Sequence, residues 1–358
     1  MSRKLRVLDA LEATVAGPAH NTLRIGAVLP LSGVLGQAGP SALEAVLLAG
    51  EEVQTSAGSS ATPLELVLLD SGGPPTSVAQ AVRHLALEGI VDAFVGLHTS
   101  DVLEAIEEAT SGFPLPYVFT AGHESRPRPP GFFSSGESAD DMAQGIRRVI
   151  ADRGVYRWAI IGSDYVWPRA VGASGRAVIE DSGGEIVLER LIPLRSTTVA
   201  APRLVAQLAV SGADAVLLSM PGRDLIEMLT ALRESGLDRR VVVYSGTLEE
   251  NVLYALDGNR SGNLYSTQHS FETLRSPQRV EFNARFTAAY GTETPALNSW
   301  AEHCYDGVHM IAGLARSGLL SAENLSMDTA SVPDDALALR PEYNIQLAVA
   351  AGMSFEIV

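Results

Sequence analysis

The stretch that decides the fold begins with LRIGAVL at residues 23–29 and continues with LELVLL at 64–69 and VDAFV at 91–95. Each is a short apolar run with the length of a buried strand. The residues between these runs carry apolar side chains at helical spacing, at 41–54 and again from Thr76 onward. Strands that alternate with helices at this rhythm predict βαβ units and a parallel, doubly wound sheet.

The same alternation starts again after a helix predicted at residues 138–150. The next strand is WAIIG at 158–162, and a helix is predicted directly after it. A second α/β unit of similar size therefore follows the first, and its predicted strands are residues 158–162, 185–191, 213–218 and 241–244.

The last part of the chain departs from this alternation. Two helices predicted at 276–290 and 296–318 have no strand between them, and residues 344–358 have the pattern of a closing hairpin. Two α/β units followed by returning helices predict several crossings between two lobes, which form a hinge. We therefore predict an α/β fold with two Rossmann-like lobes joined by a multi-crossing hinge. Its expected parts are an N-terminal extension at 1–21, a first lobe at 22–137 plus 269–326, and a second lobe at 138–268 plus 327–358.

The composition excludes several classes of function. With 358 residues, of which 46% are hydrophobic and 19% charged, the chain is typical of a globular protein with two domains. A formal net charge of -16 repels phosphates, so we expect no direct nucleic-acid partner. The single cysteine, Cys304, allows no disulfide framework and no structural zinc site of the cysteine type, and we expect it in the core.

No apolar run has the length of a membrane span. The basic start MSRKLR is followed by residues in which Asp9 and Glu12 interrupt any apolar run, so no secretory signal is recognised. We therefore expect a cytoplasmic protein. The alternative is an extracytoplasmic protein whose leader has been removed.

Polar and aromatic side chains follow the predicted strands, at the edge where open α/β sheets bind ligands. Hydroxyl groups at helix N-termini suit carboxylate or amide oxygens, although each could also be a simple helix cap. Glu249 would suit an ammonium or amide nitrogen, and Tyr165 and Trp167 offer flat walls with a polar edge. The candidate ligand-binding residues are Ser32, His98, Thr99, Ser100 and Thr120 in the first lobe and Tyr165, Trp167, Ser219, Thr247 and Glu249 in the second.

The sequence contains no motif of a common hydrolase or dehydrogenase. There is no His-Glu-x-x-His pair, no Gly-x-Ser-x-Gly elbow and no phosphate-binding loop. We therefore predict no catalytic residue, no metal site and no cofactor. His98 and His123 follow first-lobe strands and are candidates for the cleft, whereas His303 and His309 are expected to be structural.

Residues 161–169, IGSDYVWPR, resemble the Gly-Ser-Asp-Tyr-aromatic-Pro-Arg signature of short-chain amide sensors and urea receptors. LDSGG at 69–73, FVGLHTS at 94–100 and SWAE at 299–302 fit the same pattern. From about residue 23 to the end, the chain resembles the type I periplasmic-binding family, and within it the group of amide sensors, urea receptors and branched-chain amino-acid receptors.

The resemblance implies roles for individual residues. Ser100 and Thr120 match first-lobe positions that bind the polar group of the ligand, and Tyr165 matches the tyrosine that closes over it. Thr247 or Glu249 falls where the second lobe adds another contact. His98 departs from the pattern, because amide sensors and urea receptors carry a large aromatic residue there. Residues 118–124 are more similar to branched-chain amino-acid receptors.

We therefore expect non-catalytic binding of an amide, urea or amino acid between the lobes, with closure of the hinge around the ligand. The main hypothesis is a ligand sensor whose partner is a regulator protein. The alternative is an extracytoplasmic solute-binding receptor whose partner is the permease of an ABC importer. A weaker alternative is a hydrolase of small amides. The resemblance also implies a homodimer through the first lobe.

Overall fold

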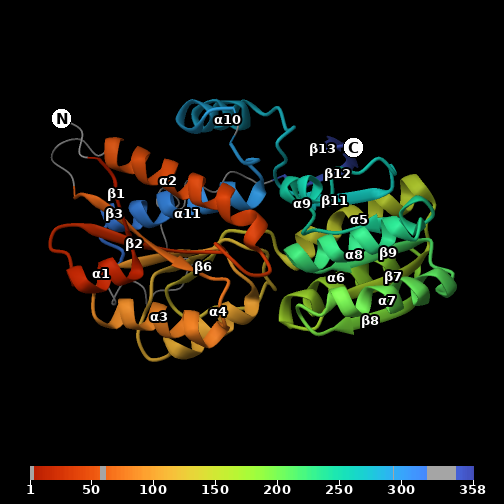
Figure 1. Ribbon diagram of the computed structural model, residues 1–358, viewed down its shortest axis with the longest axis horizontal. Coiled ribbons are helices and arrows are strands. Elements are labelled where there is room, and N and C mark those ends of the chain that lie inside the picture. Colours follow the sequence, from red (N-terminus) through yellow and green to blue (C-terminus); the bar gives the residue numbers. More distant parts are fainter. Residues whose placement is uncertain (1–3, 57–61, 293, 321–343) are drawn as a thin grey trace.

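The computed structural model describes residues 4–56, 62–292, 294–320 and 344–358. Two sheets lie side by side along the long axis of the molecule, and helices cover both faces of each sheet (Figure 1). This architecture confirms the predicted α/β fold with two Rossmann-like lobes.

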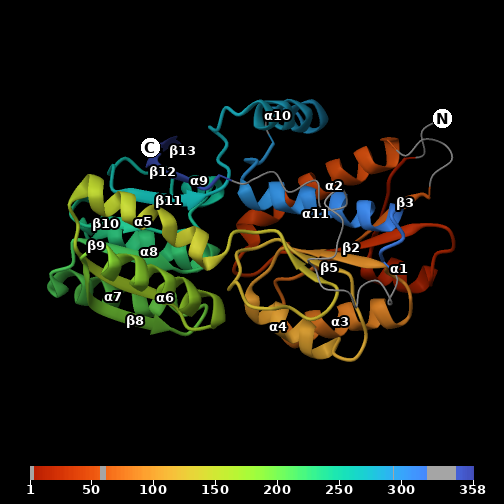
Figure 2. The same cartoon turned by 180° about the vertical axis from the view of Figure 1, so that it is seen from behind.

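The first sheet is parallel throughout. Its strands follow the order β1 (Arg6–Asp9), β3 (Leu64–Asp70), β2 (Leu23–Leu29), β4 (Ala93–Gly96), β5 (Tyr117–Phe119) and β6 (Phe132–Ser134). Its helices are α1 (Ala10–Ala16), α2 (Gly39–Ser56), α3 (Pro75–Leu87), α4 (Ser100–Ala109) and α11 (Ser299–Arg316), with a short 3-10 turn, η1, at Gly36–Ala38. Helices α2 and α11 pack together over one face, and α3 and α4 over the other (Figure 2).

The second sheet is parallel apart from its last two strands. Its order is β13 (Ser354–Ile357), β12 (Gln346–Ala351), β11 (Leu264–Gln268), β10 (Val242–Tyr244), β9 (Ala215–Ser219), β7 (Arg157–Ser163) and β8 (Glu185–Ile192). β12 pairs antiparallel with both β11 and β13, which confirms the predicted closing hairpin. The helices are α5 (Ala139–Arg153), α6 (Val166–Asp181), α7 (Thr197–Ser211), α8 (Gly222–Glu234) and α9 (Glu250–Ala255), with a 3-10 turn, η2, at Leu237–Arg239.

The second sheet is buried on both faces, as parallel sheets are. In β7, Trp158 and Ile160 pack with α5 and α6, while Ala159 and Ile161 pack with α7 and α8. Successive side chains of a strand point to opposite faces. A continuous apolar run therefore supplies side chains to two cores, and this explains why apolar runs of strand length identified these strands in the sequence.

The chain crosses between the lobes more than once. Residues 135–138 lead from β6 in the first sheet to α5 beside the second. Residues 269–298 lead from β11 back to α11, and they include α10 (Pro277–Tyr290), which contacts α2. β12 and β13 then rejoin the second sheet, so the multi-crossing hinge is confirmed. The exact lobe boundaries given above stay a prediction.

The N-terminal segment differs from the extension expected at residues 1–21. Arg6–Asp9 form β1, an edge strand that pairs with β3, and α1 follows directly. Asp9 and Glu12 form a capping box: the Asp9 side chain accepts from the Glu12 backbone (2.8 Å), and Glu12 accepts from the Asp9 backbone (3.0 Å). The two acidic residues that interrupt the apolar run therefore begin a helix.

Candidate functional site

A small cavity lies between the two lobes, at the carboxyl ends of their strands. Its volume is about 20 Å³, which is room for about one water molecule. The first lobe contributes Leu35, His98, Thr99, Ser100, Ala121 and Gly122, α11 contributes Trp300, and the second lobe contributes Tyr165, Trp167, Pro221 and Thr247.

Six of the ten predicted ligand-binding residues line this cavity: His98, Thr99, Ser100, Tyr165, Trp167 and Thr247. They meet because each follows the end of a strand, and the strand ends of the two lobes face each other. Their assignment as ligand contacts stays a prediction.

The remaining four predicted residues lie elsewhere. The hydroxyl groups of the fully buried Thr120 and Ser219 donate to backbone carbonyls, those of Gly96 (3.1 Å) and Pro168 (3.3 Å). Ser32 lies at the surface and donates to the Asp70 carboxylate (2.5 Å). These hydroxyl groups donate hydrogen bonds within the protein, and their residues do not line the cavity.

Glu249 is the fourth residue outside the cavity lining. It caps the N-terminus of α9, and its Oε2 accepts hydrogen bonds from Asn251 N (2.7 Å) and Asn298 Nδ2 (2.6 Å). Burial raises the pKa of Glu249 to about 8, so the side chain is mainly neutral at pH 7. It links the second lobe to α11 and offers little charge to an ammonium group.

The first-lobe side of the cavity is formed by His98 and the start of α4. His98 is buried, with Nε2 2.6 Å from Tyr117 Oη and Nδ1 3.1 Å from the Thr99 carbonyl oxygen. Burial lowers the pKa of His98 to about 4, so it is uncharged at pH 7. Thr99 is the N-cap of α4, but its side chain makes no capping hydrogen bond. Because Thr99 and Ser100 line the cavity, the N-terminal, positive end of the α4 dipole lies beside it.

Three aromatic side chains form the opposite wall. Tyr165 and Trp167 lie with their ring centroids 6.5 Å apart, and Trp300 completes the wall from α11. The indole Nε1 atoms of Trp167 and Trp300 are buried, and neither has a hydrogen-bond partner among the described residues. A buried donor without an acceptor costs about 1–3 kcal/mol. Both N–H groups are therefore donors for which the described residues supply no acceptor.

Burial is the main cause that raises the pKa of Tyr165 well above its usual value, with nearby Asp101, Glu124 and Asp224 adding to the effect. The tyrosine is therefore a neutral hydroxyl at physiological pH. It can donate to an anion or accept from a donor.

Sequence reasoning missed five of the lining residues. Trp300 belongs to the SWAE segment that carries part of the resemblance, yet helical periodicity alone does not say which face it presents. Gly122 lets Trp167 and Met142 pack closely against the backbone, since a Cβ there would lie 3.0 Å from Trp167 Nε1 and 2.5 Å from Met142 Cε. Leu35, Ala121 and Pro221 are ordinary apolar residues, and nothing in their local sequence marks them as cavity lining.

The lining suits an anion with an apolar body. Hydroxyl groups, two indole N–H groups and a helix N-terminus all favour a carboxylate, while the rings and aliphatic side chains favour an apolar remainder. Among the described residues, no carboxylate side chain lines the cavity. His98, the histidine that these residues contribute to the lining, has both ring nitrogens engaged within the protein.

None of the described helices combines the length and the apolar character that crossing a membrane requires.

Comparison with known proteins finds relatives along most of the chain. The family described as periplasmic binding protein matches residues 22–341. A Leu/Ile/Val-binding protein homolog 7 from Brucella melitensis is 23% identical over 302 residues, which cover 78% of this chain and 73% of the relative.

Solved structures share the fold over nearly the whole chain. A solute binding protein of an ABC transporter from Rhodopseudomonas palustris, in complex with p-hydroxybenzoic acid, has a TM-score of 0.75 at 19% identity and covers 94% of this chain and 95% of its own. The branched-chain amino acid transporter substrate binding protein LivJ from Streptococcus pneumoniae, in complex with isoleucine, has a TM-score of 0.74 at 17% identity, with 94% and 99% covered.

Proposed function

Because this chain belongs to the periplasmic binding protein family, we propose that it is the extracytoplasmic solute-binding receptor of an ABC importer. From the sequence alone, this role is the alternative and a ligand sensor is the main hypothesis. The relatives favour the alternative, since they are named as binding proteins and as transporter components. On this proposal the protein works outside the cytoplasm and its partner is a permease. The homodimer stays a prediction.

We further propose that the ligand is a small carboxylate with a flat or branched apolar body and no ammonium group. The observation that carries this proposal is the pair of indole donors, Trp167 Nε1 and Trp300 Nε1, beside the start of α4. A carboxylate placed there satisfies both donors and faces the positive end of the helix dipole.

An amino acid fits this lining less well. Its ammonium group requires a carboxylate or several carbonyl acceptors when it is buried. Glu249, the acidic residue expected to serve it, lies outside the cavity lining and is mainly neutral at pH 7. The lining therefore favours benzoate-like or branched aliphatic acids over amides, urea and α-amino acids.

Ligand entry requires the lobes to separate, because the cavity holds about one water molecule in this conformation. Contacts between the lobes include two hydrogen bonds: Arg223 N donates to the Val34 carbonyl (2.8 Å), and Asn251 Nδ2 donates to Ser41 Oγ (3.2 Å). Gly222 allows the first contact, since a Cβ there would lie 2.2 Å from Val34 O. A ligand that bridges the lobes would shift the population toward a closed form around itself.

The lining also supports binding over catalysis. A hydrolase of small amides needs a nucleophile within reach of a base. His98 is the candidate base that the described residues place in the lining, and it is engaged by Tyr117 and by the Thr99 carbonyl.

Isothermal titration calorimetry with benzoate, 4-hydroxybenzoate, 3-methylbutanoate, isoleucine, acetamide and urea tests the proposal. We expect at least one of the three acids without an ammonium group, benzoate, 4-hydroxybenzoate or 3-methylbutanoate, to bind at least 10-fold more tightly than isoleucine, acetamide or urea. The proposal on ligand class is wrong if isoleucine or acetamide binds most tightly. Turnover of acetamide would contradict the non-catalytic role.

Matched tryptophan variants test the site itself. Trp300→Phe and Trp167→Phe keep the apolar wall but remove one donor each, and a hydrogen bond to a charged group contributes about 1.5–3 kcal/mol. We expect each variant to bind the best carboxylate roughly 10–100-fold more weakly. Trp158→Phe is the control, because Trp158 Nε1 donates to the Val155 carbonyl inside the second lobe. Unchanged affinity in both cavity variants would contradict the assigned site.

A further inference from the structure

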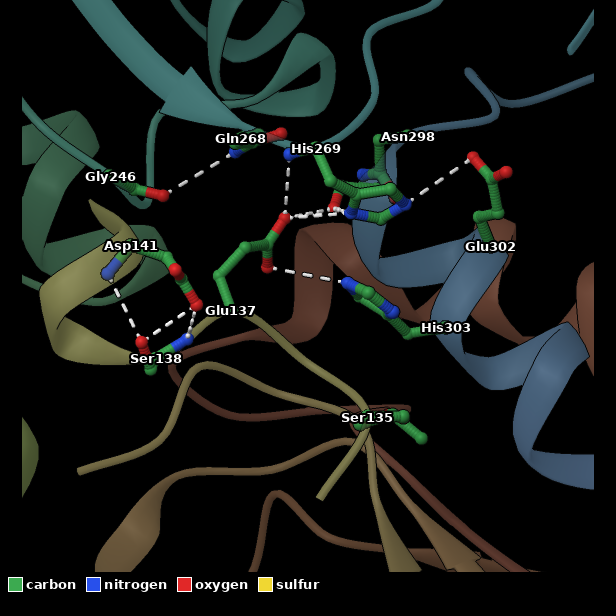
Figure 3. Close-up of polar contacts among 12 residues, drawn as sticks. Ser135, Glu137, Ser138, Asp141, Gly246, Gln268, His269, Asn298, Glu302 and His303 are labelled. Atoms are coloured by element: carbon green, nitrogen blue, oxygen red, sulfur yellow. Dashed lines mark hydrogen bonds and ion pairs between the residues drawn. The ribbon is translucent and has the colours of Figure 1, made fainter. Parts of the chain in front are cut away.

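A second group of polar side chains lies buried where the crossings of the hinge meet. Glu137 lies on the segment between β6 and α5, His269 directly follows β11, and His303 lies on α11. We call these three residues the hinge cluster. Figure 3 shows the three side chains converging from three separate segments of the chain.

The hinge cluster is compact. His269 Nδ1 lies 2.9 Å from Glu137 Oε1, and His303 Nε2 lies 3.4 Å from Glu137 Oε2. The two imidazole centroids are 4.2 Å apart, and one ligand atom from each residue lies within 4.8 Å of the others.

We propose that the hinge cluster binds one divalent transition-metal ion of the zinc class, with Glu137, His269 and His303 as its protein ligands. Two imidazoles and one carboxylate are donors that zinc takes in proteins, whereas magnesium and calcium require oxygen ligands. Ligand atoms of one tetrahedral zinc site lie about 3–3.5 Å apart. The two histidine–carboxylate distances, 2.9 and 3.4 Å, are near that spacing, and the three ligand atoms lie within 4.8 Å of one another, so the side chains would have to draw together to surround one ion.

The surroundings of His269 support this assignment. A metal-bound imidazole typically presents its other nitrogen to a carboxylate. His269 Nε2 lies 3.8 Å from Glu302 Oε2, and the same oxygen of Glu302 accepts from Arg279 Nη1 (2.6 Å). Glu302 is thus held behind the imidazole, on the side away from Glu137 (Figure 3).

The hydroxyl group of Ser299 lies beside the proposed metal ligands, and we place it at the fourth ligand position. Its hydroxyl lies 2.5 Å from Glu137 Oε1 and 2.8 Å from His269 Nδ1. In a catalytic triad the serine and the acid contact different nitrogens of the histidine. Here Ser299 and Glu137 both contact Nδ1, so the geometry is not that of an activated serine.

A bound ion would fasten three segments of the hinge to one another. Ser299 and His303 lie one helical turn apart at the start of α11, and the neighbouring Trp300 lines the cavity between the lobes. Metal binding would therefore fix the part of α11 that carries Trp300. No metal site was expected from the sequence, since its histidines form no recognised metal-binding spacing. Glu137 and His269, which meet here, are 132 residues apart.

Metal titration of the full-length protein, stripped with a chelator and without any organic ligand, tests the proposal. We expect one Zn²⁺ to be retained per chain in equilibrium dialysis. Zn²⁺ should raise the melting temperature, since binding to the folded state stabilises it. Co²⁺ should bind at the same stoichiometry and show visible absorption of a nitrogen- and oxygen-ligated site. Failure to retain Zn²⁺ or Co²⁺ at one per chain would overturn the proposal.

Variants identify the ligands. His303→Gln and His269→Gln should each lose the cobalt absorption and weaken Zn²⁺ binding at least 10-fold, and Glu302→Gln should weaken it by about 10–100-fold. His84→Gln is the matched control, since His84 is exposed on α3. Retained binding in folded His269→Gln and His303→Gln proteins would overturn the proposal, as would an equal loss in His84→Gln. If the histidine variants do not fold, a wild-type cobalt spectrum without nitrogen ligation decides against it.

Discussion

Replacing Glu249 by glutamine tests whether a buried acid makes the protein less stable at alkaline pH. Glu249 is fully buried, and Oε2 accepts from Asn251 N and Asn298 Nδ2. Glutamine can keep that acceptor oxygen and never ionises. The substitution therefore retains the contacts of the neutral acid while removing its titration.

The direction and the magnitude of the change in stability with pH follow from the pKa of Glu249. Burial raises this pKa from 4.5 to about 8, and the neighbouring Glu250 adds to the effect. The folded state holds this proton to higher pH than the unfolded chain does. The free energy of unfolding therefore falls as the pH rises from about 4.5 to about 8, and the loss is complete above that range. At about 1.4 kcal/mol per pH unit, the maximum loss is about 5 kcal/mol.

Urea denaturation at pH 6 and pH 9, at constant ionic strength and followed by tryptophan fluorescence, measures the effect. We expect Glu249→Gln to have a free energy of unfolding within about 2 kcal/mol of wild type at pH 6 and to exceed it by about 3–5 kcal/mol at pH 9. Glu104→Gln, at an exposed position on α4, should show no such difference. An equal effect of Glu249→Gln at both pH values would refute the reasoning.

Three further substitutions test the packing of α5, each measured by urea denaturation. Gly145→Ala should lower the free energy of unfolding by about 1–3 kcal/mol, because the new Cβ would lie 2.2 Å from a threonine hydroxyl of β11. Gly36→Ala is the control: its Cβ would meet no atom within 4 Å, so the loss should be under about 1 kcal/mol. Tyr244→Phe should cost about 1–2 kcal/mol, since it removes a buried hydroxyl that bonds to the α5 backbone, and a neutral result would contradict that hydrogen bond. Ser138→Ala should cost about 1 kcal/mol, because Ser138 Oγ accepts from Asp141 N at the helix start, and no change would show that this cap is dispensable.

The strands of both lobes were predictable because a parallel strand buried on two faces must be apolar at nearly every position. Residues 23–29 and 158–162 show this directly. The six predicted residues at the cavity were found for a related reason. His98, Thr99 and Ser100 follow one strand, and Tyr165 and Trp167 follow another, so the chain order alone brought them to the same edge.

Side-chain direction was not predictable in this way. Thr120 and Ser100 both follow first-lobe strands, yet the Thr120 hydroxyl donates to a backbone carbonyl while Ser100 lies at the cavity. Glu249 was expected to carry charge, but its burial beside Asn298 keeps it neutral near pH 7. Such differences depend on neighbours that are distant in sequence, and local residue type does not encode them.

By itself, the sequence determined the two α/β lobes, the repeated crossing between them and the edge where a ligand would lie, since these depend on the periodicity and order of apolar runs. Only the tertiary structure decided which side chains meet. Trp300 reaches the cavity, and Glu137, His269 and His303 meet in the hinge, because three separate segments return to one place. These contacts cannot be predicted from residue spacing along the chain, because they result from the packing of the lobes and helices against one another.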